Sequence, residues 1–243
     1  GLSGLSPLTV TKTAARFIAD GVARELGYES STGGRKAAAL GLNSSFGYAL
    51  AVDIGAHSVK VGVVNLSGEV LEKRYINANK PDIIPSFIIG PCDLAALLEE
   101  LISAYGSESC LGAGFGISGV VDRERTAALF CPNIAGWTGF DLVVYFKERL
   151  GVPVFLDTSA RCMALAERYY GAAQDEANFV FVSVGYSVAA GIFAQGKLFR
   201  GSSGSAGELG HTLVRDGTEL CTCGNRGCLE LFVTVPMALS RIK

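Results

Sequence analysis

The sequence predicts an α/β protein. From residue 46 onward, segments with the composition of β-strands alternate with segments of helical periodicity. Hydrophobic residues make up 49% of the 243 positions and charged residues 18%, which is typical of a globular chain with a substantial core. A chain of this length forms one large domain or two modest ones.

Charge and cysteine content narrow the possible functions. The net charge of −2 gives no general electrostatic attraction to nucleic acid. The charge is uneven, since residues 1–45 carry a net charge of +2 and the remainder −4, as expected if only the start of the chain contacts DNA. No apolar run is long enough to span a bilayer, and no signal peptide is seen. Together with seven mostly scattered cysteines, these features favour a reducing, cytoplasmic location.

Residues 4–43 predict a helix followed by a hairpin. Ser6 can cap the helix and Pro7 suits its first position, while one face is apolar and the other carries hydroxyl and basic groups. Residues 22–29 and 35–43 predict two strands joined by a Ser-Thr-Gly-Gly turn. A polar-basic helix before a basic-tipped hairpin is the pattern of the second half of a winged helix-turn-helix. An ordinary amphipathic helix beside a hairpin explains the same residues equally well.

If this segment binds DNA, two sets of side chains make the contact. Basic groups suit phosphates, and short hydroxyl groups suit base edges in the major groove. The candidates are Lys12, Arg16, Arg35 and Lys36 for the phosphates, and Thr9, Thr11 and Thr13 for the groove.

The remaining elements follow in the order expected of an α/β fold. Three β-rich runs at 48–76 precede a helix at 92–106 and a strand that enters a glycine-rich turn at 111–122. The series continues with a helix at 141–151, a short buried strand at 153–157, a helix at 159–171 and a β-hairpin at 178–201.

Polar or small residues gather where these strands end, which is where ligands bind in most α/β folds. They are Asp53, Ser118–Gly119, Asp157–Ser159 and Gly185. Asp53 interrupts an apolar strand, and a carboxylate there is costly unless it is hydrogen-bonded, binds a metal or lies at the edge of a cleft. A simple cap of the following turn is the alternative role.

The segment GELGHTLVRDGTELCTCGNRGCLE (207–230) contains a candidate zinc site. Its ligands are His211, Cys221, Cys223 and Cys228, and the glycines between them let the backbone turn so that the sulfurs face one point. Three thiolates and one imidazole form a closed tetrahedral set typical of structural zinc. An iron–sulfur cluster usually has four cysteines. A Cys221–Cys228 disulfide is the alternative that a reducing cytoplasm disfavours.

Two carboxylates, Glu208 and Glu230, flank the ligands. A closed site leaves no position for water, so catalysis by the metal is not expected. A ligating histidine directs its second ring nitrogen to a partner, so the metal would hold His211 and both glutamates in one small volume. Such an array suits hydroxyl-rich molecules; alternatively, the glutamates only brace the site or lie in solvent.

These residues resemble the ROK family of sugar kinases and sugar-responsive repressors. GELGH (207–211) followed by CTCGNRGCLE (221–230) is similar to the family's zinc-binding signature. Residues 4–45 are similar to the recognition helix and wing of the repressors. Other segments look like family segments in order and spacing. AVDIG (51–55) and VSVGYSVAAGIFAQGKLFRG (182–201) resemble the two phosphate-binding turns. GISGVVD (116–122) and PNIAGW (132–137) resemble loops near the sugar, and LDTSARCMALAERYYG (156–171) resembles the catalytic strand and helix.

The resemblance implies a two-lobed, actin-like (ribonuclease H-like) sugar kinase fold preceded by a partial winged helix-turn-helix. It assigns the partial winged helix-turn-helix to residues 1–45, the first lobe to 46–155 and the second lobe, with the zinc knuckle, to 156–243. Against the family pattern, the first helices of the DNA-binding domain and the end of the second lobe are expected to be missing.

The chain departs from the family's kinases in three places. Their general base is an aspartate where this chain has Ser159, and a serine hydroxyl without a partner is too weak a base at neutral pH. The first phosphate turn reads DIGAH instead of DIGGT. The second reads GYSVAAG (185–191) instead of Gly-Thr-Gly-x-Gly, so that Tyr186, Val188 and Ala189 add side chains where the backbone must approach a phosphate. The resemblance therefore implies no phosphoryl transfer.

The resemblance also assigns ligand residues. Those that match the family's sugar contacts are Glu208, His211 and Glu230. Weaker matches are Gly119, Asn133 and Thr158, the last in place of a family asparagine. The residues of a vestigial nucleotide site are Asp53, Gly55 and Gly185.

The implied function is a sugar-responsive transcriptional regulator, usually a repressor of carbohydrate utilisation genes. It would carry zinc, bind operator DNA as a homodimer or higher oligomer, and respond to a small sugar or sugar phosphate; xylose, glucose and N-acetylated amino sugars lie within the family's range. Two alternatives remain open. One is a ROK-type sugar kinase that phosphorylates glucose or an N-acetylated amino sugar with ATP. The other is a zinc-stabilised dimerisation module without a small ligand.

Overall fold

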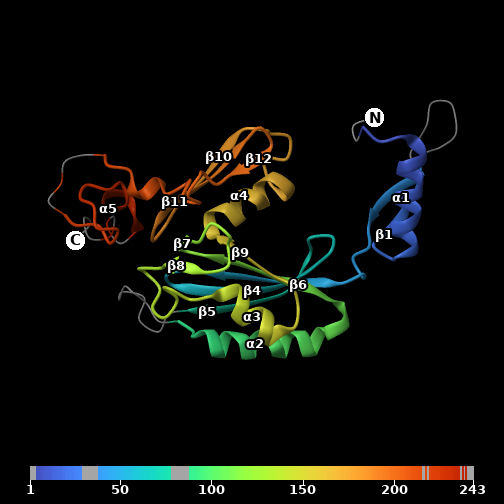
Figure 1. Ribbon diagram of the computed structural model, residues 1–243, viewed down its shortest axis with the longest axis horizontal. Helices are drawn as coiled ribbons and strands as arrows, with labels where there is room; N and C mark the ends of the chain where they lie inside the picture. The colour runs from blue at the N-terminus through green and yellow to red at the C-terminus, as the bar shows by residue number, and fades with distance from the viewer. Residues whose placement is uncertain are drawn as a thin grey trace.

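A central five-stranded sheet organises the chain (Figure 1). The computed structural model describes residues 4–28, 38–77, 88–214, 217, 219–235, 237 and 239. Within these residues the α/β class is confirmed. None of the helices in this part of the chain is long and apolar enough to cross a membrane.

The N-terminal segment is a helix with a two-stranded hairpin, and it lies apart from the central sheet in Figure 1. The helix α1 (Pro7–Ala19) begins as predicted, because the Ser6 hydroxyl accepts a hydrogen bond from the backbone amide of Thr9 at 3.2 Å. Strands β1 (Ala23–Tyr28) and β2 (Ala38–Leu42) pair antiparallel. No residue of α1 is buried, and the exposed apolar side chains on it include Val10, Phe17 and Ile18.

The central sheet has the strand order β5-β4-β3-β6-β9. The first three strands are antiparallel, whereas β6 runs parallel to β3, and β9 parallel to β6. Their bounds are β3 (Tyr48–Ile54), β4 (Ser58–Asn65), β5 (Val70–Asn77), β6 (Cys110–Ile117) and β9 (Val154–Thr158). Because Ile54 pairs with Ile117 and Ile117 with Thr158, the carboxyl ends of the three parallel strands meet at one edge. The lobe boundary expected after residue 155 falls inside β9.

Two helices cover one face of this sheet and close the core (Figure 1). They are α2 (Pro91–Tyr105) and α3 (Leu142–Leu150). Gly151 ends α3 in the left-handed conformation, with φ 67°, as its position after the helix predicts. A short turn of 3₁₀ helix (Ser107–Ser109) precedes β6, and a small pair of strands, β7 (Val120–Val121) and β8 (Ala128–Phe130), follows it.

The second sheet corrects one expectation, because residues 178–201 form three strands rather than a hairpin. These are β10 (Phe179–Val184), β11 (Val188–Ala194) and β12 (Lys197–Phe199), in the order β10-β11-β12. The same antiparallel meander opens the central sheet as β3, β4 and β5. A 3₁₀ turn (Leu209–His211) and α5 (Glu230–Val233) follow.

The helix α4 (Ser159–Tyr170) joins the two sheets, and it contacts β6 and β9 as well as β10 and β11. Its contact with β11 is close at Gly191. A Cβ atom added there would lie 2.4 Å from the Cβ atom of Ala164 and 2.7 Å from the carbonyl oxygen of Ala160. The small side chains on both sides are therefore what lets α4 lie against the second sheet.

Replacing Gly191 with alanine is expected to destabilise the protein by about 1–3 kcal/mol, because the added methyl group must displace α4 from β11. Urea unfolding of the full-length protein measures the change. Gly114→Ala is the matched control, since it is also a strand glycine but its added Cβ would meet no atom within 4 Å. Equal effects of the two substitutions would contradict the packing argument.

Candidate functional site

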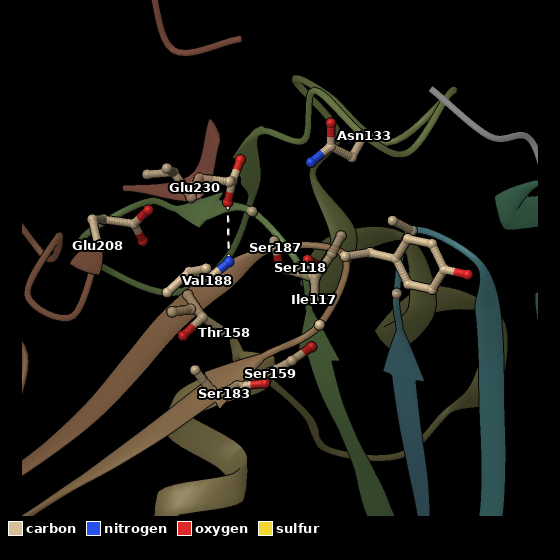
Figure 2. A pocket seen from close by; sticks show the side chains of 18 of the residues that line it. Ile117, Ser118, Asn133, Thr158, Ser159, Ser183, Ser187, Val188, Glu208 and Glu230 are labelled. Carbon is tan, nitrogen blue, oxygen red and sulfur yellow. Dashed lines mark hydrogen bonds between the residues drawn. The ribbon is translucent and has the colours of Figure 1, made fainter. Parts of the chain in front are cut away.

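One cavity of about 260 Å³ lies where the strand ends of both sheets meet (Figure 2). The turns after β3 and β6, the start of α4 and the β10–β11 turn line it, together with the segment around residues 207–211 and α5. The structure brings into this cavity every residue expected to bind sugar or to belong to the nucleotide site: Asp53, Gly55, Gly119, Asn133, Thr158, Gly185, Glu208, His211 and Glu230. Of the residues expected at the strand ends, all line this cavity except Asp157.

Two half-buried carboxylates form one end of the cavity. Glu230 accepts a hydrogen bond from the backbone amide of Val188 at 3.0 Å, which ties α5 to the start of β11. Glu208 points toward the same space in Figure 2, and its carboxyl oxygen lies 4.0 Å from Nε2 of His211. Burial raises the pKa of the Glu208 carboxyl above its ordinary value. Both side chains keep acceptor oxygens that a hydroxyl-bearing ligand can use.

Gly119 has a packing role that its position in the sequence does not reveal. A Cβ atom there would lie 2.5 Å from the carbonyl oxygen of Phe130 and 2.6 Å from Sγ of Cys131. The glycine therefore lets the loop after β6 approach the loop after β8. Asn133, on that second loop, lines the cavity as a result (Figure 2).

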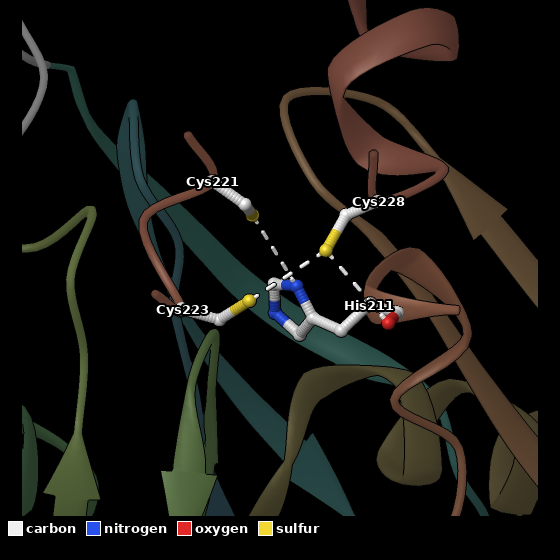
Figure 3. A group of neighbouring side chains, drawn as sticks. All are labelled: His211, Cys221, Cys223 and Cys228. Carbon is white, nitrogen blue, oxygen red and sulfur yellow. Dashed lines mark hydrogen bonds between the residues drawn. The ribbon is translucent and has the colours of Figure 1, made fainter. Parts of the chain in front are cut away.

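The four predicted metal ligands form a compact cluster (Figure 3). Nδ1 of His211 lies 3.6 Å from Sγ of Cys221, the Sγ atoms of Cys223 and Cys228 are 3.6 Å apart, and all four ligand atoms lie within 4.8 Å of one another. Zinc–sulfur bonds of about 2.3 Å at tetrahedral angles place sulfurs about 3.8 Å apart, so the cluster fits one such ion. All seven cysteines lie among the described residues as free thiols, so the alternative Cys221–Cys228 disulfide is absent there.

The histidine of this cluster also faces the cavity. Its Nδ1 atom points to the cysteines, whereas Nε2 faces Glu208. A metal on Nδ1 would leave the second ring nitrogen to orient the carboxylate, which is the arrangement expected around ligating histidines. The cluster could thus position one wall of the cavity.

Ser159 has a partner that sequence reasoning missed. Its hydroxyl donates a hydrogen bond of 2.6 Å to Oδ1 of Asp53, and Nζ of Lys60 lies 3.3 Å from Oδ2 of the same carboxylate. Ser159 and Asp53 are 106 positions apart, so nothing local in the sequence joins them. Lys60 is opposite Asp53 in the β3–β4 register, and the alternation of these two strands could have revealed that pair.

Asp157 does not line this cavity, and three arginines surround its carboxylate. Its carboxylate lies 3.2 Å from Arg161, 2.9 Å from Arg200 and 3.9 Å from Arg125. Arg161 is 1% exposed and also donates hydrogen bonds to the carbonyl oxygens of Gly204 and Ala206. Asp157 is therefore a structural centre between β9, α4 and the segment after β12.

Two aromatic rings meet at the other end of the cavity. His57, in the β3–β4 turn, and Tyr186, in the β10–β11 turn, have ring centroids 3.3 Å apart and planes 30° apart. The second turn is shorter than expected, since Val188 and Ala189 belong to β11 and only residues 185–187 form the turn. Tyr186 was predicted to alter this turn, but its contact with His57 was not.

The described DNA candidates all lie on exposed α1. Some of their polar groups are used within the helix: the Thr11 hydroxyl donates to the carbonyl oxygen of Pro7, and the Arg16 guanidinium lies 3.5 Å from Asp20. The Thr9 hydroxyl contacts that of Ser6. Lys12 and Thr13 are also exposed, whereas Arg35 and Lys36 lie outside the described residues.

A model of the ROK family matches residues 49–241. The chain belongs to the ROK family. It is 32% identical over 244 residues to the xylose repressor of Caldicellulosiruptor bescii, covering 100% of this chain and 60% of that protein. The chain thus spans about 60% of the length of this curated relative.

Solved ROK structures agree with the fold. A ROK family transcriptional regulator, a homolog of the MLC protein of Escherichia coli, superposes with a TM-score of 0.78 at 25% identity, over 99% of this chain and 60% of that one. A ROK glucokinase from Streptomyces griseus, in complex with glucose and AMPPNP, superposes with a TM-score of 0.66 at 29% identity, over 80% of this chain and 59% of that one. The actin-like sugar kinase fold expected from the sequence is confirmed.

Asp157→Asn is expected to destabilise this ROK chain by about 3–5 kcal/mol, because it leaves the buried guanidinium of Arg161 without its charged partner. Chemical denaturation of the full-length protein measures the loss. Asp175→Asn, on an exposed carboxylate, is the matched control and is expected to change stability by less than about 0.5 kcal/mol. Similar values for both variants would show that Asp157 has no central role.

Proposed function

We propose that this ROK chain is part of a sugar-responsive transcriptional regulator that represses carbohydrate utilisation genes. The observation that carries the proposal is the extent of the structural match: the ROK regulator aligns with 99% of the chain and the glucokinase with 80%. The family model begins at residue 49, so the regulator also accounts for most of the helix and hairpin that precede it.

In this proposal the N-terminal segment is the recognition helix and wing of a winged helix-turn-helix. The unburied α1 presents Lys12, Thr13 and Arg16 without contacts from the central sheet, which supports a surface made for another molecule. Basic groups would contact phosphates and the threonines the edges of bases, as in helices of this class. Thr9, Thr11, Arg35 and Lys36 complete the proposed set, and a homodimer would bind the operator.

The effector is proposed to be a small sugar held at the carboxylate end of the cavity. Glu208, His211 and Glu230 would contact its hydroxyl groups, which are good donors to carboxylate oxygens. Asn133, Thr158 and the loop at Gly119 would bound the opposite side. Xylose is the first candidate, because the curated relative named above is a xylose repressor.

Zinc is proposed as the ion of the Cys/His cluster. His211, Cys221, Cys223 and Cys228 would hold it, and a closed set of soft ligands would give it a structural role. With Nδ1 of His211 on the metal, the Nε2 side would stay directed at Glu208. The metal would therefore shape the sugar site without taking part in a reaction.

We also propose that phosphoryl transfer has been lost. At the phosphate end, Asp53 is already paired with Lys60 and Ser159, and the rings of His57 and Tyr186 occupy the space between the two turns. Asp157 cannot serve as the base while its arginines hold it. The hydrogen bond between Ser159 and Asp53 favours the alternative, a sugar kinase, since Ser159 could take the proton of a sugar hydroxyl while passing its own proton to the Asp53 carboxylate.

Sugar binding and catalysis can be tested together. Calorimetry of the full-length protein against xylose, glucose and N-acetylglucosamine is expected to detect one sugar, and gel shifts are expected to show that this sugar alters operator binding. ATP turnover should stay at background, because Ser159 stands where the family's kinases have their aspartate base and two rings fill the phosphate end. Sugar-dependent ATP consumption would instead support the kinase.

Glu230→Gln is expected to weaken sugar binding at least tenfold, the effect of losing a charge-assisted hydrogen bond of about 1.5–3 kcal/mol. Glu219→Gln is the matched control, because this exposed glutamate is close in the sequence and outside the cavity. Equal sugar affinities in both variants would show that Glu230 does not contact the sugar, whereas no sugar binding even by the wild type would support the dimerisation module that has no small ligand.

The purified protein is expected to contain one zinc per chain, measured by native mass spectrometry, and a chelator is expected to lower its melting temperature. Cys223→Ser should lose the zinc, whereas Cys92→Ser, on an exposed cysteine outside the cluster, should retain it. Wild-type protein that stays metal-free in zinc buffer, with a melting temperature unaffected by chelator, would exclude the site.

A further inference from the structure

The turn at residues 185–187 is held from both sides of the cavity. At one end, the ring of Tyr186 contacts the ring of His57 in the β3–β4 turn. At the other end, two residues along, the amide of Val188 donates to the carboxylate of Glu230. A segment of three residues thus links the proposed sugar contact to the first lobe.

Backbone hydrogen bonds hold both turns that meet at the cavity. The turn itself is closed by a hydrogen bond from the amide of Gly185 to the carbonyl oxygen of Ser187, and the carbonyl oxygen of Gly185 accepts from the amide of Val235. On the other side, the turn that carries His57 is closed by a hydrogen bond of 3.0 Å from the amide of Gly55 to Ser58. Movement of Glu230 must therefore displace either its bond to Val188 or the turn that carries Tyr186.

A sugar hydroxyl at Glu230 acts on the first of these links. The oxygen that receives the Val188 amide belongs to the carboxylate that the sugar would engage, and a sugar hydroxyl bound to that same oxygen would compete with the amide. A ligand shifts a conformational equilibrium only through contacts that differ between the two states, and a Val188–Glu230 bond weakened by this competition would be such a contact. The ring contact between Tyr186 and His57 can pass this shift on to the first lobe, because it directly joins the β10–β11 turn to the β3–β4 turn.

We propose that Glu230, Val188, Tyr186 and His57 form a relay through which the bound sugar changes how firmly the two lobes are joined. The proposal rests on the function proposed above, since it takes a sugar as the ligand at Glu230. Tyr186 and His57 act as positioning residues, since neither is a proposed sugar contact. Their ring contact lies between the β3–β4 and β10–β11 turns, which are the two turns that depart from the kinase pattern.

Hydrogen exchange of the full-length protein without a ligand tests the ring contact between His57 and Tyr186. Tyr186→Ala is expected to speed exchange in the peptide that contains Gly55, and His57→Ala to speed it in the peptide that contains Val188, each two- to tenfold, the range for one aromatic pair. In each peptide, the double variant should exchange at the same rate as the corresponding single variant. Tyr186→Phe should restore slow exchange, and Tyr169→Ala, an exposed tyrosine of α4, should have no effect. If the effects of the two substitutions on the exchange rate add up in the double variant, the two rings do not act as one unit and the proposal is overturned.

Sugar binding then tests the relay. In wild type, a sugar found by calorimetry is expected to change exchange at both peptides; in Tyr186→Ala it should still act at Val188 but lose most of its effect at Gly55. An undiminished effect at Gly55 would overturn the relay and leave the proposed function standing. If no sugar binds the wild type, the proposed function fails, and the relay fails with it. Tyr186 is 41% exposed, so its truncation leaves the core intact.

Discussion

The buried carboxylate of Asp157 is the interaction on which the geometry of the cavity depends. It comes from β9 of the central sheet, and the guanidinium groups that hold it come from α4, from the end of β12 and from the β7–β8 turn. A buried charge of this kind persists only when it is paired. Through Arg161 the same centre reaches the carbonyl oxygens of Gly204 and Ala206, which directly precede the segment that carries Glu208. The relative position of the two sheets therefore depends on these ion pairs as well as on the packing of α4 against β11.

The two ends of the cavity differ in what they can bind. The end near the Cys/His cluster offers carboxylate oxygens, which suit the hydroxyl groups of a neutral sugar. A phosphate needs free backbone amides or a free cation, yet at the other end Lys60 is already committed to Asp53 and two rings fill the approach. The electrostatics of the site thus favour a neutral polyol over a nucleotide.

Much of this structure could be predicted from local patterns. Ser6 and Gly151 mark the ends of their helices because capping depends on neighbouring residues, and the four metal ligands lie within 18 positions and share one chemistry. Contacts between distant segments could not be predicted in this way. Ser159 meets Asp53 because β3 and β9 end at the same edge of the central sheet, and His57 meets Tyr186 because turns of the two sheets converge there. The short strand β12 also escaped prediction, since three residues carry no clear period of two.

The meander that opens each sheet has a consequence for the two rings. His57 lies in the first turn of the β3–β4–β5 meander, and Tyr186 lies in the first turn of the β10–β11–β12 meander. They therefore occupy equivalent places in an approximate internal symmetry that the sequence itself does not display as a repeat. Because the two rings contact each other, a change at one position alters the surroundings of the other. In related chains the two positions should consequently covary, with small residues at both or with a matched pair of larger ones.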